Sequence, residues 1–177
     1  QNPQDINILL SNSIKTPQDL KTLVAQIEEL SKSSNIDGGG VSFAGFDKGS
    51  DWIVITALGS GTYALIMSGL KLAQEYFKTK KEYYNSKDAE LNYKTHLAQS
   101  SKKDEKFTQE GFEDFQKKRL EIQLEDGIDD IAVKMKRYNG FEENEIRTRL
   151  KKTTDSLIEI INGSNEIHIS MNPPKEV

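Results

Sequence analysis

The chain has 177 residues, of which 35% are hydrophobic and 29% are charged, and its formal net charge is −4. This length suits one domain, and the acidic balance argues against sequence-independent nucleic-acid binding, which needs a basic face. Because there is no cysteine, disulfides and thiolate chemistry are excluded, as in many proteins of a reducing compartment.

The N-terminal residues predict a strand followed by a helix. Hydrophobic residues alternate over residues 5–10, which is the period of a half-buried strand. Thr16 and Pro17 are typical of a helix start, because threonine caps a helix and proline fits its first position. The helix that follows has an apolar stripe at helical spacing, formed by Leu20, Leu23, Val24, Ile27 and Leu30.

A β-hairpin is predicted after a polar loop that ends in three glycines. Residues 41–46 and 51–57 are rich in β-branched and aromatic side chains. Residues 47–50, with the sequence Asp-Lys-Gly-Ser, have the composition of a hairpin turn.

Residues 62–101 predict one long helix, because apolar residues recur at alternating steps of four and three. Three lysines occupy this stripe, so its second half must be shallow or solvated. The stripe consists of Ile66, Leu70, Ala73, Phe77, Lys80, Tyr84, Lys87, Leu91, Lys94 and Ala98.

Two more helices and a last strand complete the pattern. A helix over residues 108–138 ends at Gly140, a residue suited to a left-handed C-terminal position. A further helix is expected over 142–162, and a short strand over 166–171. The inward stripe of the first of these helices comprises Phe112, Phe115, Leu120, Leu124, Ile128, Ile131 and Met135. That of the second comprises Ile146, Leu150, Leu157 and Ile161.

The element order β-α-β-β-ααα-β predicts an α+β fold. If the three helices replace one, this order is that of a ferredoxin-like sheet of four mostly antiparallel strands. We therefore expect a single domain over residues 1–177. The sheet and first helix would comprise residues 1–61 and 163–177, and residues 62–162 would form a long helical arm.

Residues 52–70 carry no charged side chain, a length near the minimum for a membrane span. A membrane-associated or pore-type component is therefore one alternative. The favoured interpretation is a buried strand that turns into the apolar start of a helix, because the first part is β-branched and the middle is rich in glycine.

A second alternative is a small anion- or ligand-binding domain. The run Gly59-Ser60-Gly61-Thr62 falls at the predicted strand-to-helix turn, where backbone N–H groups can hold an anion. A phosphate loop would need further glycines and a lysine at fixed spacing, which this run lacks. A tight turn capped by Ser60 or Thr62 is the simpler interpretation.

No catalytic or metal-binding pattern is visible, so we expect no enzyme activity and no cofactor. Neither histidine, His96 or His168, has a second ligand or a carboxylate at a suitable spacing. Acidic residues cluster over 121–130, but a solvated helix face paired with lysines explains them better than a cation site.

The leading hypothesis is a non-enzymatic module that binds a protein partner, or a copy of itself, through the helical arm. The candidate contact residues are Tyr76, Lys80, Tyr83, Tyr84, Lys87 and Tyr93, because half-exposed tyrosine supplies a large amphipathic area. The aromatic spacing is helical, and no nucleic-acid partner is expected.

A cytoplasmic location is expected from the cysteine-free composition. The chain begins at Gln1 rather than methionine, so we expect it to have been processed, and an exported or anchored origin stays open. The abundance of Asn, Lys, Ile and Ser is compatible with an AT-rich genome, such as that of a bacterium or phage.

Overall fold

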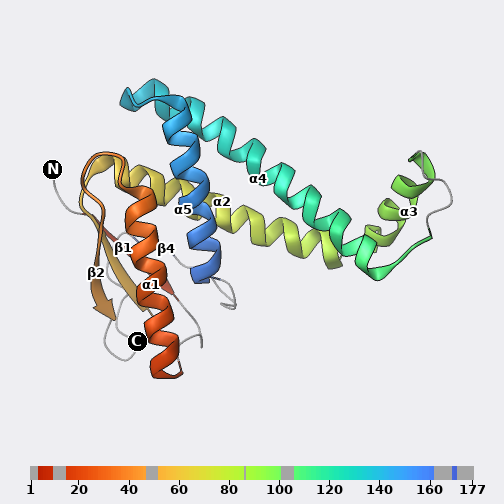
Figure 1. Cartoon of the computed structure of the whole chain (residues 1–177), viewed down its shortest axis with the longest axis horizontal. Coiled ribbons are helices and arrows are strands. Elements are labelled where there is room, and N and C mark those ends of the chain that lie inside the picture. The colour runs from red at the N-terminus through yellow and green to blue at the C-terminus, as the bar shows by residue number, and fades with distance from the viewer. Residues whose placement is uncertain are drawn as a thin grey trace. The chain divides into compact units, whose positions relative to one another are not determined.

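The computed structural model describes residues 4–9, 15–46, 52–85, 87–100, 106–161 and 169–170. Its helices and strands follow one another in the order shown in Figure 1. The N-terminal part comprises β1 (Gln4–Leu9), α1 (Pro17–Ser34), β2 (Val41–Phe46) and β3 (Trp52–Ala57). Then come α2 (Ser60–Asn85), α3 (Ala89–Gln99), α4 (Gln109–Asn139), α5 (Glu143–Ile161) and β4 (Ile169–Ser170). The protein is therefore mostly helical, in agreement with the predicted α+β class.

The chain divides into two compact units. The first, which we call the sheet unit, comprises Gln1–Ala73 and Ile128–Val177. The second, which we call the hairpin unit, comprises Gln74–Gly127. Helices α2 and α4 contribute residues to both units, whereas the sequence placed the ends of the arm at residues 62 and 162.

The sheet consists mainly of three antiparallel strands of six residues each, with β3 between β2 and β1. Ile55 of β3 lies opposite Ile6 of β1 on one side and Phe43 of β2 on the other. The two-residue β4 pairs antiparallel with β1, on the edge away from β3. The predicted turn at 47–50 lies outside the described residues, as do residues 166–168 of the predicted last strand.

Helix α1 begins at Pro17 after the predicted N-cap Thr16, and a complete capping box, which was not predicted, is also present. The Thr16 hydroxyl accepts a hydrogen bond from the Asp19 N–H, and the Asp19 carboxylate accepts one from the Thr16 N–H. Leu23, Ile27 and Leu30 are buried, but Leu20 and Val24 are exposed. The predicted stripe was too wide, because only a narrow face of α1 is covered by its neighbours.

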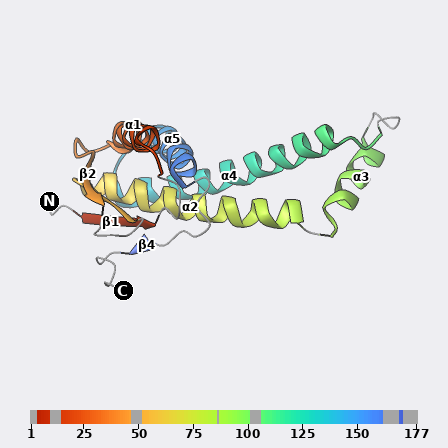
Figure 2. The same cartoon turned by 90° about the horizontal axis from the view of Figure 1, so that it is seen from below.

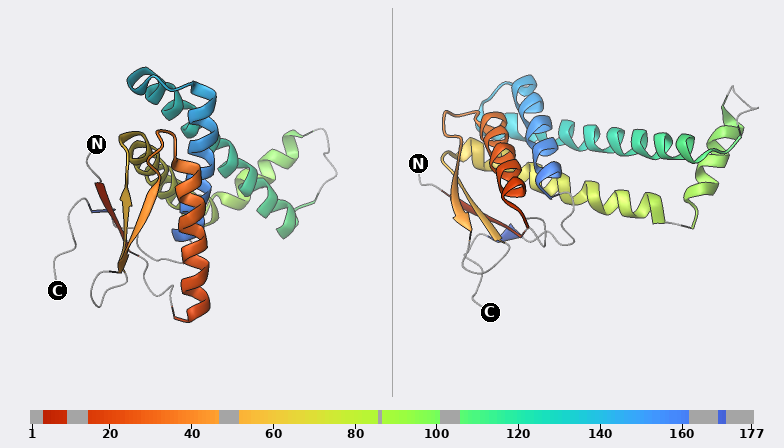
Figure 3. Two further views of the ribbon diagram at one scale, coloured as in Figure 1. Left: turned by 60° about the vertical axis from the view of Figure 1, so that its left-hand side comes forward. Right: turned by 60° about the horizontal axis from the view of Figure 1, so that its bottom comes forward.

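The core of the sheet unit lies between the sheet and its helices. Helices α1 and α5 lie side by side, with the same face of the sheet towards them (Figures 1 and 2). The right-hand view of Figure 3 shows α1 beside the edge of the sheet formed by β2. The largest fully buried side chains of this unit are Ile6, Leu30, Ile55, Leu65, Ile66, Leu70, Ile128, Ile146, Leu150 and Leu157.

The predicted helix over 62–101 is two helices. Helix α2 ends at Asn85 and α3 begins at Ala89. Because Asn and Asp side chains compete for backbone hydrogen bonds, Asn85 and Asp88 favour a turn over a continuous helix. The break changes the helical phase, so Leu91, which the continuous stripe placed in the seam, is 60% exposed.

Both of the last two predicted helices are present. The predicted stripe of α4 is confirmed in part, because Phe115, Leu124 and Ile131 are only partly buried. Phe112, Leu120, Ile128 and Met135 of α4 are buried. The predicted α5 stripe of Ile146, Leu150, Leu157 and Ile161 is buried throughout. Gly140 has a φ of 71° between the two helices, so a left-handed glycine ends α4 as expected.

Candidate functional site

The hairpin unit has a hydrophobic cluster within its own residues. Ala89, Tyr93 and Leu97 lie on one face of α3 and are buried with Phe112 of α4. The Tyr93 ring centroid lies 6.0 Å from that of Phe112, a distance at which aromatic pairs attract one another. Three partly buried rings pack against the cluster, those of Tyr84, Phe107 and Phe115. Large aromatic side chains therefore hold α3 against α2 and α4.

Polar side chains join α2 and α4 within the hairpin unit. The Tyr83 hydroxyl donates to Gln123 Oε1 at 3.1 Å, and Gln123 Nε2 donates to Thr79 Oγ1 at 3.2 Å. The buried Gln116 donates to the Tyr83 carbonyl at 3.0 Å. The guanidinium carbon of Arg119 lies 3.9 Å from the Tyr83 ring centroid, a favourable cation–π geometry. Because these groups need their partners, they fix the register of the two helices.

The predicted contact tyrosines mostly pack inside the hairpin unit. Tyr93 is buried, so it is not available as a half-exposed contact. Tyr84 packs against the cluster, and desolvation together with the charge of Glu113 raises the pKa of its hydroxyl. Tyr83 bridges α2 and α4, and the ring of the partly buried Tyr76 makes an edge contact with Phe77 at 5.4 Å.

The predicted lysines are exposed. Lys80 lies on α2 and Lys87 follows the end of that helix. The structure therefore separates the predicted set into tyrosines that support the hairpin and lysines that face solvent.

Two large hydrophobic side chains on the hairpin unit are the most exposed of their kind among the described residues. Leu91 of α3 and Ile122 of α4 are each 60% exposed. Each lies two positions from a buried residue of its own helix, Tyr93 in α3 and Leu120 in α4, and therefore on the opposite face of that helix. Charged side chains surround Ile122 along α4, namely Lys118, Glu121, Glu125 and Asp126, and all are exposed.

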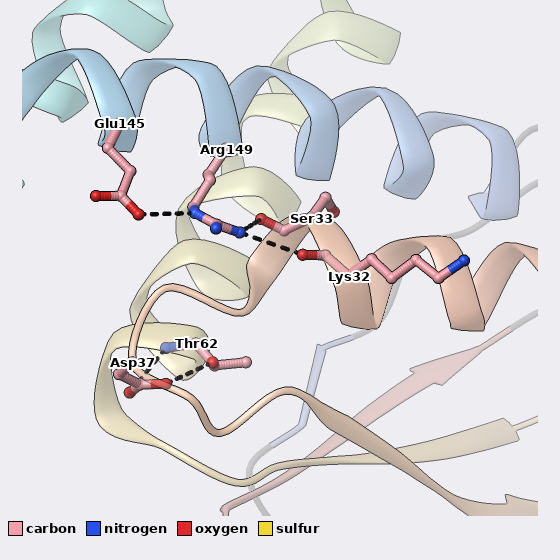
Figure 4. A network of polar contacts seen from close by, with 6 residues as sticks. All are labelled: Lys32, Ser33, Asp37, Thr62, Glu145 and Arg149. Carbon is pink, nitrogen blue, oxygen red and sulfur yellow. Dashed lines mark hydrogen bonds and ion pairs between the residues drawn. The ribbon is translucent and has the colours of Figure 1, made fainter.

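The predicted anion site at the start of α2 contains a carboxylate of the protein itself (Figure 4). Asp37 accepts hydrogen bonds from the Gly61 N–H at 2.7 Å and from the Thr62 hydroxyl at 2.9 Å. The N–H groups of Thr62 and Gly39 donate at 3.4 and 3.1 Å. Partial burial opposes ionisation, but these hydrogen bonds outweigh it and lower the pKa of Asp37. An external anion would have to displace this carboxylate.

The close approach of Asp37 requires glycine at the turn. A Cβ atom at Gly59 would lie 2.6 Å from Cγ of Asp37, closer than a packed structure allows. Glycine at this turn therefore leaves room for the Asp37 side chain, which occupies the predicted anion site.

A groove of about 650 Å³ lies between α1 and α5 in the sheet unit. Its walls carry charges of both signs, including those of Glu29, Lys32 and Lys152. Arg149 reaches across it and donates to the carbonyls of Lys32 and Ser33 at 3.2 and 3.3 Å (Figure 4). Its Nε lies 3.2 Å from Glu145 Oε1. Because these carbonyls are at the end of α1, the guanidinium caps that helix.

Sequence reasoning missed several of these residues. Asp37 lies in a loop, 24 positions before the N–H of Gly61 that it binds, and no local pattern connects them. Arg149 is more than a hundred residues from the carbonyls it caps. The exposure of Ile122 could have been predicted from the sequence, because this residue falls outside the predicted α4 stripe.

The described residues contain no group of three or more His, Cys, Asp or Glu side chains that could hold a metal ion. In the same residues, no helix combines the length and the apolar character needed to cross a membrane. The uncharged segment 52–70 is divided between β3, a turn and α2, as the favoured interpretation predicted. Comparison with protein-family models, with curated proteins and with solved structures finds no match to this chain.

Proposed function

We propose that the protein is a non-enzymatic interaction module that binds a protein, or a second copy of itself, through the hairpin unit. The observation that carries this proposal is the exposure of Leu91 and Ile122, each at 60%, on helices whose own core is already complete. Apolar side chains outside such a core are available to a partner, whereas the aromatic cluster is not.

The construction of the hairpin unit supports this role. Its aromatic cluster and its polar seam hold α2, α3 and α4 together without using the outer faces of α3 and α4. A helix that presents apolar side chains on a charged face is a common recognition element for another helix or a groove. The exposed Lys80 and Lys87 would belong to the polar rim of such an interface.

Affinity capture from a lysate of the source organism tests the proposal. The native chain should retain a stoichiometric protein, and a Leu91→Arg/Ile122→Arg variant should lose it, because buried arginine would be left unpaired. A matched variant, Leu20→Arg/Val24→Arg, alters hydrophobic side chains of the sheet unit that are 38% and 40% exposed and should retain the same protein. Equal capture by all three chains would refute the proposal.

For the fold, we propose a ferredoxin-like arrangement in which the chain after α5 forms a full fourth strand beside β1. The strand order β2-β3-β1-β4 and the antiparallel pairing of Ile8 with Ile169 support it. Nuclear Overhauser contacts between residues 4–9 and 166–171 would extend the pairing. If contacts were restricted to residues 169 and 170, the longer strand would not exist.

A further inference from the structure

The charges on α4 are arranged with opposite signs on the two sides of Ile122. Lys118 lies four positions before this residue, and Glu125 and Asp126 lie three and four positions after it. Positions three and four apart are neighbours on a helix surface. The exposed isoleucine therefore has a basic neighbour on its N-terminal side and acidic neighbours on its C-terminal side.

These charged side chains are available to a partner. Lys118, Glu125 and Asp126 are exposed, and within the described part of the chain none of them makes an ion pair. Arg119, the other basic residue beside Ile122, is already engaged, because it stacks on Tyr83 and donates to Gln116 at 3.0 Å. The surface that remains has one hydrophobic side chain between a lysine and two carboxylates, with the exposed Glu121 beside it.

This arrangement is complementary to itself under a two-fold rotation. If two α4 helices cross antiparallel at Ile122, Lys118 of each copy meets Glu125 and Asp126 of the other. The distances agree, because positions four before and three to four after the centre lie about 4.5–6 Å from it along the axis. A parallel crossing would instead place like charges together, which is unfavourable.

We propose that the Ile122 surface, defined by Lys118, Ile122, Glu125 and Asp126, is an antiparallel contact with a second copy of this chain. The proposal rests on the proposed function and specifies its partner. Contacts that are the same on both copies close into a dimer rather than a filament. Glu121, also exposed, lies on the flank of the contact, where solvent screens its charge.

The contact is small and partly electrostatic, so the dimer should be weak and sensitive to salt. One hydrophobic side chain per copy lies at its centre, which corresponds to the low end of specific interfaces. Surface ion pairs weaken as salt screens them. Association should therefore be visible at high protein concentration and low ionic strength and should decline as salt is added.

Charge reversal in complementary pairs tests the proposal on the full chain. Sedimentation equilibrium of Lys118→Glu alone, and of Glu125→Lys/Asp126→Lys alone, should each show a dimer dissociation constant raised by about tenfold or more. An equimolar mixture of the two variants should recover association, because each reversed charge then faces an opposite one. Circular dichroism of each variant should match that of the native chain.

Two single substitutions locate the contact. Ile122→Ser should weaken the dimer, whereas Leu91→Ser removes an equally exposed side chain elsewhere on the hairpin unit and should leave it unchanged. The proposal is overturned if the native chain stays monomeric at low salt. It is also overturned if the mixture fails to recover association, or if Leu91→Ser abolishes it. Capture of a different protein through Ile122 by a monomeric chain would retain the proposed function and reject this contact.

Discussion

Asp37 shows how one side chain connects two distant segments of the sheet unit. Its carboxylate lies in the loop after α1 and receives hydrogen bonds from the first turn of α2. A negative charge at a helix N-terminus is favourable, because the unpaired N–H groups carry partial positive charge. The side chain thus takes the position that an external anion would take, and it ties the loop to the helix.

Removing this carboxylate should destabilise the protein. For Asp37→Ala we expect the free energy of unfolding at pH 7 to fall by about 1.5–3 kcal/mol, because charged hydrogen bonds are lost and N–H groups lose their acceptor. Urea unfolding followed by circular dichroism measures this. Asp88→Ala removes an N-cap carboxylate that makes no capping hydrogen bond, and it should change stability by less than about 0.5 kcal/mol.

The same carboxylate should give the protein an acid-sensitive contribution. Because the folded-state pKa of Asp37 lies below its ordinary value of 3.8, its stabilisation is present above that value. It is lost as the pH falls through the lower folded-state pKa. Between neutral and strongly acidic pH, the free energy of unfolding should therefore decline more steeply for the native chain than for Asp37→Ala. Identical acid limbs would exclude this role.

At the level of elements, the end of α1 depends on a side chain from α5. Arg149 donates to two carbonyls of the last turn of α1, groups that have no partner within the helix. Arg149→Ala should lower the free energy of unfolding by about 1–2 kcal/mol. The exposed Lys152 lies in the same groove, and Lys152→Ala should have little effect. Thermal unfolding of both variants makes the comparison.

Helix α3 provides a direct test of which side chains are packed and which are free. Tyr93→Ala should destabilise the hairpin unit by about 3–5 kcal/mol, the usual cost of truncating a buried aromatic residue. Leu91→Ala should change it by less than about 0.5 kcal/mol, because that side chain is exposed. Amide hydrogen exchange in residues 89–99 reports on this unit alone. Faster exchange in Leu91→Ala than in Tyr93→Ala would reverse the assignment.

Elements with strong local signals were predictable. The N-cap Thr16, most of the stripe of α4 and the left-handed Gly140 were predicted from the sequence, because each depends on residues within a few positions. The break before α3 was not predicted, since the stripe continued through Lys87 and Leu91 with correct spacing. The short polar run that begins at Asn85 outweighed that spacing.

The candidate site was less predictable than the elements. Lys80 and Lys87, which were proposed as contacts, are exposed. Tyr84 and Tyr93 were expected to be half-exposed, but both pack in the aromatic cluster, because the sequence gives no direct measure of burial. Their packing depends on Phe107 and Phe112, which approach only when α3 folds back on the hairpin. Phase changes and long-range contacts of this kind have no local signature.

At the level of the whole molecule, the two compact units differ in the side chains that they bury and expose. The sheet unit contains most of the fully buried aliphatic side chains, whereas the hairpin unit combines an aromatic cluster with exposed charges. This distribution explains how a chain with only 35% hydrophobic residues folds. It also leaves the outer faces of α3 and α4 as the surface to which we assign binding.

The measurement that tests this assignment most directly is photo-crosslinking from position 122, in a lysate of the source organism and with the purified chain. With a photoreactive residue in place of Ile122, we expect a discrete adduct with a protein partner or a second copy. The same residue in place of Val24, on the sheet unit, should give none. Adducts from both positions, or from position 24 alone, would contradict binding through the hairpin unit.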